Sequence, residues 1–194
     1  MAKKSIDLAV ATDPNWVNVI LDNFDEFLPD HANCERKASA LAMSMVVKYP
    51  DREQIIPSLI VLAQEELEHF RQVYALMRTR GLSLTKDLQD PYVNALIALM
   101  RSGREERFID RMLISSVIEC RGAERFKLIA DALEDPELKV FYRDLWAAET
   151  KHGHQFVDMA LRCVPAETVY PRLNELMANE AEIISTLEWR ASLH

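Results

Sequence analysis

Apolar residues recur at intervals of three or four positions over long stretches of this chain, and strand-like alternation is hard to find. That interval is typical of an amphipathic α-helix, which turns one apolar stripe toward a core. Only four glycines interrupt the 194 residues. The pattern therefore predicts an all-α protein.

Capping residues and prolines divide the periodic stretches into separate helices. Asp13 followed by Pro14 predicts a helix over about 13–28, and Pro29 is expected to end it and restart the chain. The same reasoning predicts helices over about 30–48, 52–80, 90–103, 105–133 and 136–163, and a final helix after Pro165.

The order of these helices predicts a known architecture. Two long helices, a connection that contains a short helix, and two more long helices are typical of a ferritin-like four-helix bundle with one long crossover. The first and last predicted helices are additional to the bundle. Since 194 residues lie near the upper end of one ordinary domain, we expect a single ferritin-like domain over 1–194.

The motif Glu-x-x-His occurs twice, once in each predicted pair of long helices. Glu66 and His69 belong to the stretch EELEHFRQ, and Glu149 and His152 belong to AAETKHGHQ. Residues three apart on a helix lie about 60° apart around its axis, so the carboxylate and imidazole of each motif can converge on one ion. A single motif would be weak evidence among 31 acidic residues, but the repeat strengthens it.

A lone glutamate precedes each motif at nearly the same distance. Glu35 lies 31 residues before the first motif glutamate, and Glu119 lies 30 residues before the second. Four carboxylates and two imidazoles form the ligand set of dinuclear iron or manganese sites in ferritin-like bundles, and imidazole favours iron. The predicted metal ligands are Glu35, Glu66, His69, Glu119, Glu149 and His152.

Several neighbouring residues compete for a role at this site. Glu124 is an alternative to Glu119, but only Glu119 keeps the repeated spacing. His154 lies about 160° around the helix from the second motif histidine, which predicts a solvent-facing or supporting position. We expect His31 to be an exposed histidine near a helix start, although it could reach the edge of the site. Tyr142 shares a helix face with the second motif and could line the cavity there, although packing alone would explain it.

Composition and cysteine content restrict the class of protein. Apolar residues make up 49% and charged residues 28% of the chain, which is typical of a globular protein. No apolar run reaches the length of a membrane span, and the first residues do not form a secretory signal, so we expect a cytoplasmic protein without a membrane partner. Cys34, Cys120 and Cys163 include no Cys-x-x-Cys pair, which favours buried thiols over a disulfide or zinc site.

The charge distribution bears on nucleic-acid binding. The net charge of −8 opposes a general basic surface. Two local runs are nevertheless rich in arginine and lysine: they contain Arg71, Arg78, Arg80 and Lys86, and Arg101, Arg104, Arg107 and Arg111. These side chains could form a basic rim that contacts phosphates, or they could be solvated residues that complement helix dipoles.

The sequence around the predicted ligands resembles the ferritin-like family of tRNA 2-methylthio-N6-isopentenyladenosine hydroxylases (MiaE-like proteins) over nearly the whole chain. The specific part of the resemblance lies in the stretches ECRGAERF and EELEHFRQV. The resemblance implies a non-haem diiron monooxygenase that uses dioxygen and electrons from an unidentified donor protein. Its substrate would be tRNA, and it would hydroxylate the prenyl side chain of an adenosine next to the anticodon. By position, the resemblance implies the same six ligands.

The sequence is also compatible with two other functions. The same ligands would serve a ferritin-like diiron oxidase or peroxidase, of the rubrerythrin or ferroxidase type, that has no tRNA substrate. A non-catalytic helical adaptor is the third interpretation, and it predicts that no iron binds. The apolar residues near the motifs, including Leu62, Phe70 and Phe156, fit both a substrate pocket and ordinary core packing.

Overall fold

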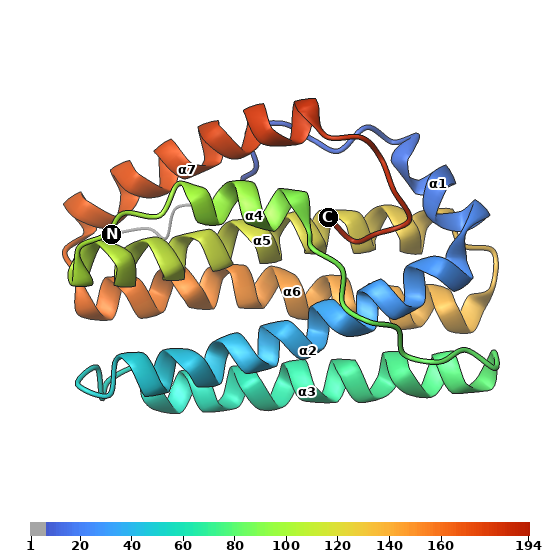
Figure 1. The fold of residues 1–194 in the computed structure, drawn as a ribbon, viewed down its shortest axis with the longest axis horizontal. Helices are drawn as coiled ribbons and strands as arrows, with labels where there is room; N and C mark the ends of the chain where they lie inside the picture. The colour runs from blue at the N-terminus through green and yellow to red at the C-terminus, as the bar shows by residue number, and fades with distance from the viewer. Residues whose placement is uncertain (1–6) are drawn as a thin grey trace. The chain divides into compact units, whose positions relative to one another are not determined.

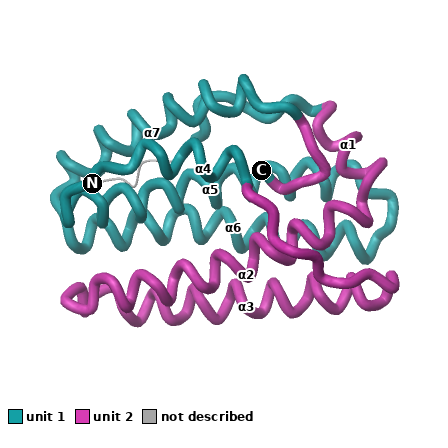
Figure 2. The backbone as a smooth tube through the Cα atoms, in the orientation of Figure 1, with its two compact units in different colours: residues 1–14, 90–188, 194 teal, residues 15–89, 189–193 magenta. Residues whose placement is uncertain are grey.

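A computed structural model describes residues 7–194 of this protein, and among them seven α-helices and no strand occur (Figure 1). The chain forms two compact units, which Figure 2 distinguishes by colour. Unit 1 takes the described part of 1–14, together with 90–188 and 194, and unit 2 takes 15–89 and 189–193. The helical class is as predicted, whereas the expectation of a single domain stays a prediction.

Unit 2 is built around a helical hairpin. It contains α1 (Trp16–Asp22), α2 (Phe24–Lys48) and α3 (Ile56–Thr79), and α2 and α3 lie side by side (Figure 1). The Arg80 Nη2 to Asp25 Oδ1 ion pair, at 2.6 Å, joins the end of α3 to the start of α2, so the two helices run antiparallel. Midway along the pair, the Ser39 hydroxyl donates to the Ala63 carbonyl at 2.8 Å.

The first helix boundary differs from the prediction. The chain breaks at Asn23, where φ is −130° and ψ is 38°, and Pro29 lies inside α2 instead of before it. Proline at this depth removes one backbone hydrogen bond from the helix. Pro29 is buried together with Phe27 and Leu28, both of which are fully shielded from solvent. Burial of these side chains offsets the missing bond, so tertiary packing overrides the local signal.

Unit 1 contains a second helical hairpin and two covering helices. Its elements are α4 (Pro91–Ala98), α5 (Arg104–Ala132), α6 (Pro136–Cys163) and α7 (Ala166–Thr186). Helices α5 and α6 pack along their length, α7 packs on both of them, and α4 packs on α7 and α5. Asp90 and Asp135 cap α4 and α6, since the carboxylate of each accepts hydrogen bonds from the backbone at the helix start.

A buried ionic network joins α7, α4 and the N-terminal segment to α5. Arg121, which is fully buried, donates to both carboxylate oxygens of Glu180 on α7, at 2.8 and 3.0 Å. The Tyr92 hydroxyl of α4 donates to the same carboxylate at 3.0 Å. Arg121 also bonds the Thr12 hydroxyl and the Val10 carbonyl. The network therefore fixes the elements that cover α5.

Most of the remaining helix boundaries follow the predictions, but α4 ends at Ala98, five residues before its predicted end, and α7 ends at Thr186 instead of continuing toward the last residues. Pro57 lies in the first turn of α3, and Gly81 follows the helix with a φ of +73°, a conformation that glycine adopts without strain. The predicted helix over 136–163 is observed with those bounds. The final helix begins at Ala166 and ends at Thr186. No helix in the described part of the chain is long and apolar enough to cross a membrane.

Candidate metal centre

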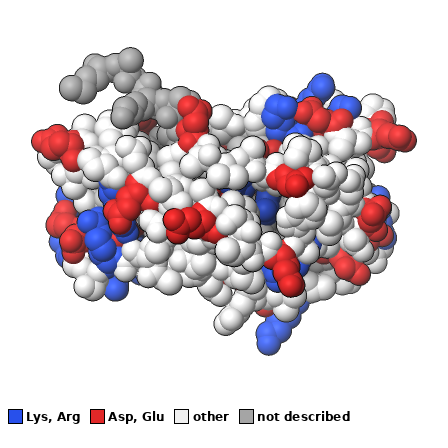
Figure 3. Space-filling model, turned by 90° about the horizontal axis from the view of Figure 1, so that it is seen from above, with Lys and Arg blue, Asp and Glu red and all other residues white. Residues whose placement is uncertain are grey.

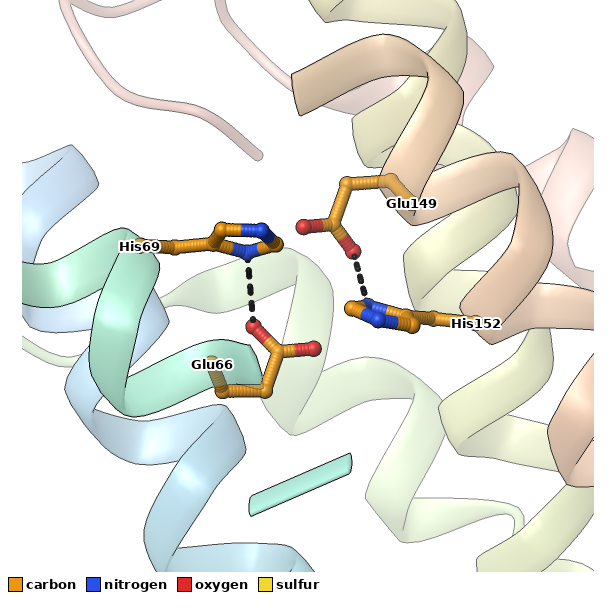
Figure 4. A group of neighbouring side chains, drawn as sticks. All are labelled: Glu66, His69, Glu149 and His152. Carbon is orange, nitrogen blue, oxygen red and sulfur yellow. Dashed lines mark hydrogen bonds and ion pairs between the residues drawn. The ribbon is translucent and has the colours of Figure 1, made fainter. Parts of the chain in front are cut away.

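In unit 2, two buried carboxylates face one imidazole nitrogen. Glu35 of α2 and Glu66 of α3 are 3% and 1% exposed. The Nδ1 atom of His69, one helical turn after Glu66, lies 3.5 Å from Glu66 Oε2 and 3.6 Å from Glu35 Oε2 (Figure 4 shows the pair on α3). The unit therefore brings together the three ligands that the sequence predicts for it.

His31 is also part of this arrangement, contrary to the expectation of an exposed histidine. It is fully buried, its Nε2 lies 2.7 Å from Glu35 Oε1, and its ring stacks on Phe27 with the centroids 5.4 Å apart. The spacing of four residues between His31 and Glu35 carries this signal in the sequence. The prediction of an exposed histidine is wrong because α2 begins at Phe24, so His31 lies two turns inside the helix instead of at its start.

In unit 1, the second motif forms a similar pair. Glu149 and His152 of α6 are 2% and 0% exposed, and the His152 Nδ1 atom lies 3.2 Å from Glu149 Oε2 (Figure 4). Glu119 lies on α5, the partner helix, and is half-buried. In both motifs Nδ1 is thus the nitrogen that faces the carboxylate. This leaves Nε2 to be oriented by a supporting group.

The other candidates near the second motif have separate roles. The carboxylate of Glu124 accepts hydrogen bonds from the Thr12 backbone and hydroxyl and from Arg121, so it belongs to the buried network. His154 is half-buried, and its Nδ1 lies 2.8 Å from the Thr150 carbonyl, which agrees with a supporting or solvent-facing position. Tyr142 is fully buried and packs against Phe126, at 5.7 Å between centroids.

A close approach of α5 and α6 sets the position of the second motif. Gly153 directly follows His152, and a Cβ atom there would lie 2.7 Å from the Cys120 sulfur. The Ser116 hydroxyl donates to the Gly153 carbonyl at 2.8 Å. All three cysteines are free, and burial raises the pKa of Cys120 to about 12, so this thiol acts as a packing group. Gly153 is not among the predicted site residues, although glycine inside a long helix is a signal of close contact.

The donor set fits a dinuclear iron centre. Each unit offers one carboxylate and one imidazole, from Glu66 and His69 in unit 2 and from Glu149 and His152 in unit 1, and three of these four residues are buried. Buried carboxylates are costly unless they are paired, hydrogen-bonded or bound to a cation. Carboxylate oxygens with imidazole nitrogens suit iron or manganese better than a soft, thiolate-bound ion. The ligand role of all six predicted residues stays a prediction.

The predicted basic residues are partly engaged by neighbouring acids. The side chains of Arg71 and Arg80 pair with Glu68 and Asp25, and Arg101 pairs with the buried Asp110. Figure 3 shows acidic and basic side chains interspersed on the face that it draws. Part of the expected basic rim is therefore neutralised within the protein, and its contact with tRNA stays a prediction.

A family model and two related proteins that match this chain all carry the name of a tRNA hydroxylase. The family model described as tRNA-(ms2io6A)-hydroxylase (MiaE) matches residues 1–194. A relative from Pseudomonas putida, named tRNA 2-(methylsulfanyl)-N(6)-isopentenyladenosine(37) hydroxylase, is 30% identical over 187 residues, which cover 96% of this chain and 91% of the relative. A relative of the same name from Salmonella typhimurium is 29% identical over 156 residues, which cover 80% of this chain and 57% of that protein.

A solved structure is also similar to this chain. It is described as Protein 43 with aldehyde deformylating oxygenase activity from Synechococcus, and it matches with a TM-score of 0.91 and 34% sequence identity. The match covers 96% of this chain and 94% of the other. This similarity confirms the predicted fold class, an all-α, ferritin-like architecture.

Proposed function

This chain belongs to the tRNA-(ms2io6A)-hydroxylase (MiaE) family, and from that premise we propose that it hydroxylates the isopentenyl side chain of 2-methylthio-N6-isopentenyladenosine in tRNA. The observation that supports this proposal most directly is the repeated half-site. Each helical hairpin supplies one Glu-x-x-His motif with a buried glutamate and an imidazole Nδ1 facing it. A tRNA substrate would place the enzyme in the cytoplasm.

Each hairpin would supply three ligands to a centre of two iron ions. When bound, the iron pair supplies the activation of dioxygen that hydroxylation of an unactivated C–H bond requires. The proposed ligands are Glu35, Glu66 and His69 from unit 2, and Glu119, Glu149 and His152 from unit 1.

The protein's own residues hold these ligands in place and keep water away. His31 holds one oxygen of Glu35, which leaves the other oxygen facing His69. The motif glutamates are almost completely shielded from solvent, so the hydration of their charges must be replaced by fixed groups. The absence of a Cβ at Gly153 lets α6 approach α5, which sets the distance between the helices that carry Glu119 and Glu149.

The proposed reaction needs electrons from outside the chain. The substrate C–H group, dioxygen, two electrons and two protons give the C–OH product and one water. The chain has three free cysteines and no Cys-x-x-Cys pair that could hold a rubredoxin-like iron site. A separate donor protein would therefore deliver the two electrons.

Mass spectrometry of tRNA nucleosides tests the function. The host should make the prenylated adenosine but lack its hydroxylase, and the protein should be expressed there as wild type and as Glu119→Ala. We expect a nucleoside heavier by one oxygen atom with the wild type and none with the variant. The matched control is Glu68→Ala, because Glu68 is exposed and its carboxylate pairs with Arg71.

One result would reject the tRNA assignment. If the wild type carries two irons and receives electrons from a chemical mediator, yet no oxygenated nucleoside forms, the protein does not hydroxylate this substrate. A diiron oxidase or peroxidase would then explain the ligand pattern better.

A further inference from the structure

The outward side of α3 carries apolar and polar side chains in a seven-residue repeat. Ile60, Leu67 and Tyr74 are spaced seven apart and are 41%, 56% and 39% exposed. A second row lies four positions further along the helix and consists of three exposed polar residues, Gln64, Arg71 and Arg78. Positions four and seven apart fall on one side of a helix. We call these six residues the α3 outer face.

The apolar row of this face is exposed to solvent. Within unit 2, α3 packs against α2 alone, whereas α5 in unit 1 is covered by α7 and α4. Four exposed large apolar side chains lie on α3: the three of the apolar row and Val61. Single exposed apolar residues are normal, but several of them aligned on one side of a helix beside a polar row suit a docking site.

The α3 outer face lies directly behind the proposed iron ligands. Glu66 is buried and His69 is half-buried on the inward side of the same helix, and Leu67 falls between them in sequence. At 100° per residue, the mean direction of these two ligands is nearly opposite to the centre of the outer face. A partner bound there would be separated from the ligands by about one helix diameter, roughly 10–12 Å.

We propose that the α3 outer face docks an acidic one-electron carrier protein, which supplies the electrons for hydroxylation. This inference rests on the proposed function, because only a reaction that consumes two external electrons needs such a partner. It names the chemistry of the partner: a protein with carboxylates around a small apolar centre, close to an exposed redox cofactor.

The charges of the polar row are complementary to such a partner. Arg78 is exposed and makes no ion pair among the described residues. Arg71 uses its Nε and Nη2 atoms to bind Glu68, which leaves further N–H groups of its guanidinium for another carboxylate. Arginine and tyrosine are enriched at the centres of protein interfaces.

The same observations disfavour two other occupants. A tRNA contact would use a surface that is mainly polar and basic, whereas half of this face is Ile, Leu and Tyr. A second copy bound by two-fold symmetry would bring the same two arginines from each chain into one interface. An acidic protein with an apolar centre would contact the apolar row and also pair its carboxylates with the arginines of the polar row.

The test measures reduction of the bound iron, which requires no tRNA substrate. The probes are a reduced acidic [2Fe–2S] ferredoxin and a flavodoxin hydroquinone, with dithionite and methyl viologen as the small-molecule reductants. In Leu67→Glu, and separately in Arg78→Glu, we expect reduction by the effective carrier to slow at least tenfold. Iron content and reduction by the small reductants should not change. The matched control is Val140→Glu, since Val140 is exposed on α6.

Four results would overturn the proposal. One is equal carrier-driven reduction in the wild type and both α3 variants, or no carrier-driven reduction in any protein that the small reductants do reduce. Another is loss of binding to a tRNA anticodon stem-loop in the α3 variants with carrier reduction intact, which would assign the face to tRNA. The last is a wild-type dimer in sedimentation that Leu67→Glu dissociates. If only the hydroxylase assignment is wrong, no oxygenated nucleoside forms, but the carrier still reduces the iron of the wild type faster than that of the α3 variants.

Discussion

The α2–α3 and α5–α6 hairpins carry the same pattern of proposed ligands but are supported in different ways. In unit 1, α5 is covered by α7 and α4 and is tied to them by a buried ionic network through Arg121 and Glu180. In unit 2, α3 packs against α2 alone and exposes an apolar row. Equal ligand spacing therefore does not imply equal surroundings, because a helix that carries proposed ligands is covered in one half and exposes an apolar row in the other.

The largest expected effect comes from removing one motif glutamate from either hairpin. Glu66→Ala and Glu149→Ala should each reduce hydroxylation by roughly a hundredfold or more, because the metal loses a buried ligand. Iron analysis and nucleoside mass spectrometry measure this. Without iron, both variants should unfold at a higher temperature than the wild type, since each removes a buried carboxylate. If either variant binds iron normally, the two hairpins do not contribute equally to iron binding.

Breaking the buried ionic network should destabilise the protein strongly. Arg121→Ala leaves the fully buried Glu180 carboxylate without its main counter-charge, which typically costs about 3–5 kcal/mol. Urea unfolding measures the change. The comparison variant in unit 2 is Arg71→Ala, which removes a pair with Glu68 on the exposed side of α3 and should not change the midpoint measurably. If Arg121→Ala and Arg71→Ala lower the free energy of unfolding by similar amounts, the two units do not differ in how their helices are supported.

We expect a pH-dependent contribution to the free energy of unfolding at the start of α4, one of the helices that cover α5. Burial raises the pKa of Asp90, but the ion pair with His194 and hydrogen bonds from the Tyr92 and Val93 backbone outweigh it and lower the pKa to about 2. A lowered carboxyl pKa in the folded state stabilises the fold above about pH 4, and this stabilisation is lost as the pH falls toward 2.

Asp90→Asn isolates this contribution. The wild type should lose up to about 2 kcal/mol more than the variant between pH 4 and pH 2, because the neutral amide does not titrate. Urea unfolding at several pH values measures the difference. Parallel curves for the two proteins would show that Asp90 does not carry the effect.

The smallest expected effect concerns the support of the lone glutamates. His31→Phe keeps a ring against Phe27 but removes the nitrogen that holds Glu35, so iron affinity should fall about tenfold. The matched position in unit 1 is Ser115, four residues before Glu119, where Ser115→Ala should have a smaller effect. Iron titration with a competing chelator measures both. An equal loss in the two variants would show that the halves are supported alike.

Much of the fold follows from local signals in the sequence. The bounds of α6 were predicted because Asp135 caps the helix and Pro136 occupies its first position, where the missing N–H has no partner to lose. The end of α3 was predicted because Gly81 takes a left-handed conformation. The start of α2 was not predicted, because burial of Phe27, Leu28 and Pro29 outweighs the tendency of proline to end a helix.

The sequence by itself determined the helical class, the ligand candidates and the family resemblance, because repeated motifs and helix caps are local patterns of residues. Only the tertiary structure decided that His31 is buried against Glu35, that Glu124 belongs to the Arg121 network, and that the outer side of α3 is exposed. The physical reason is that burial and hydrogen-bond partners depend on residues far apart in the chain. Thr12 and Glu124, for example, are 112 positions apart.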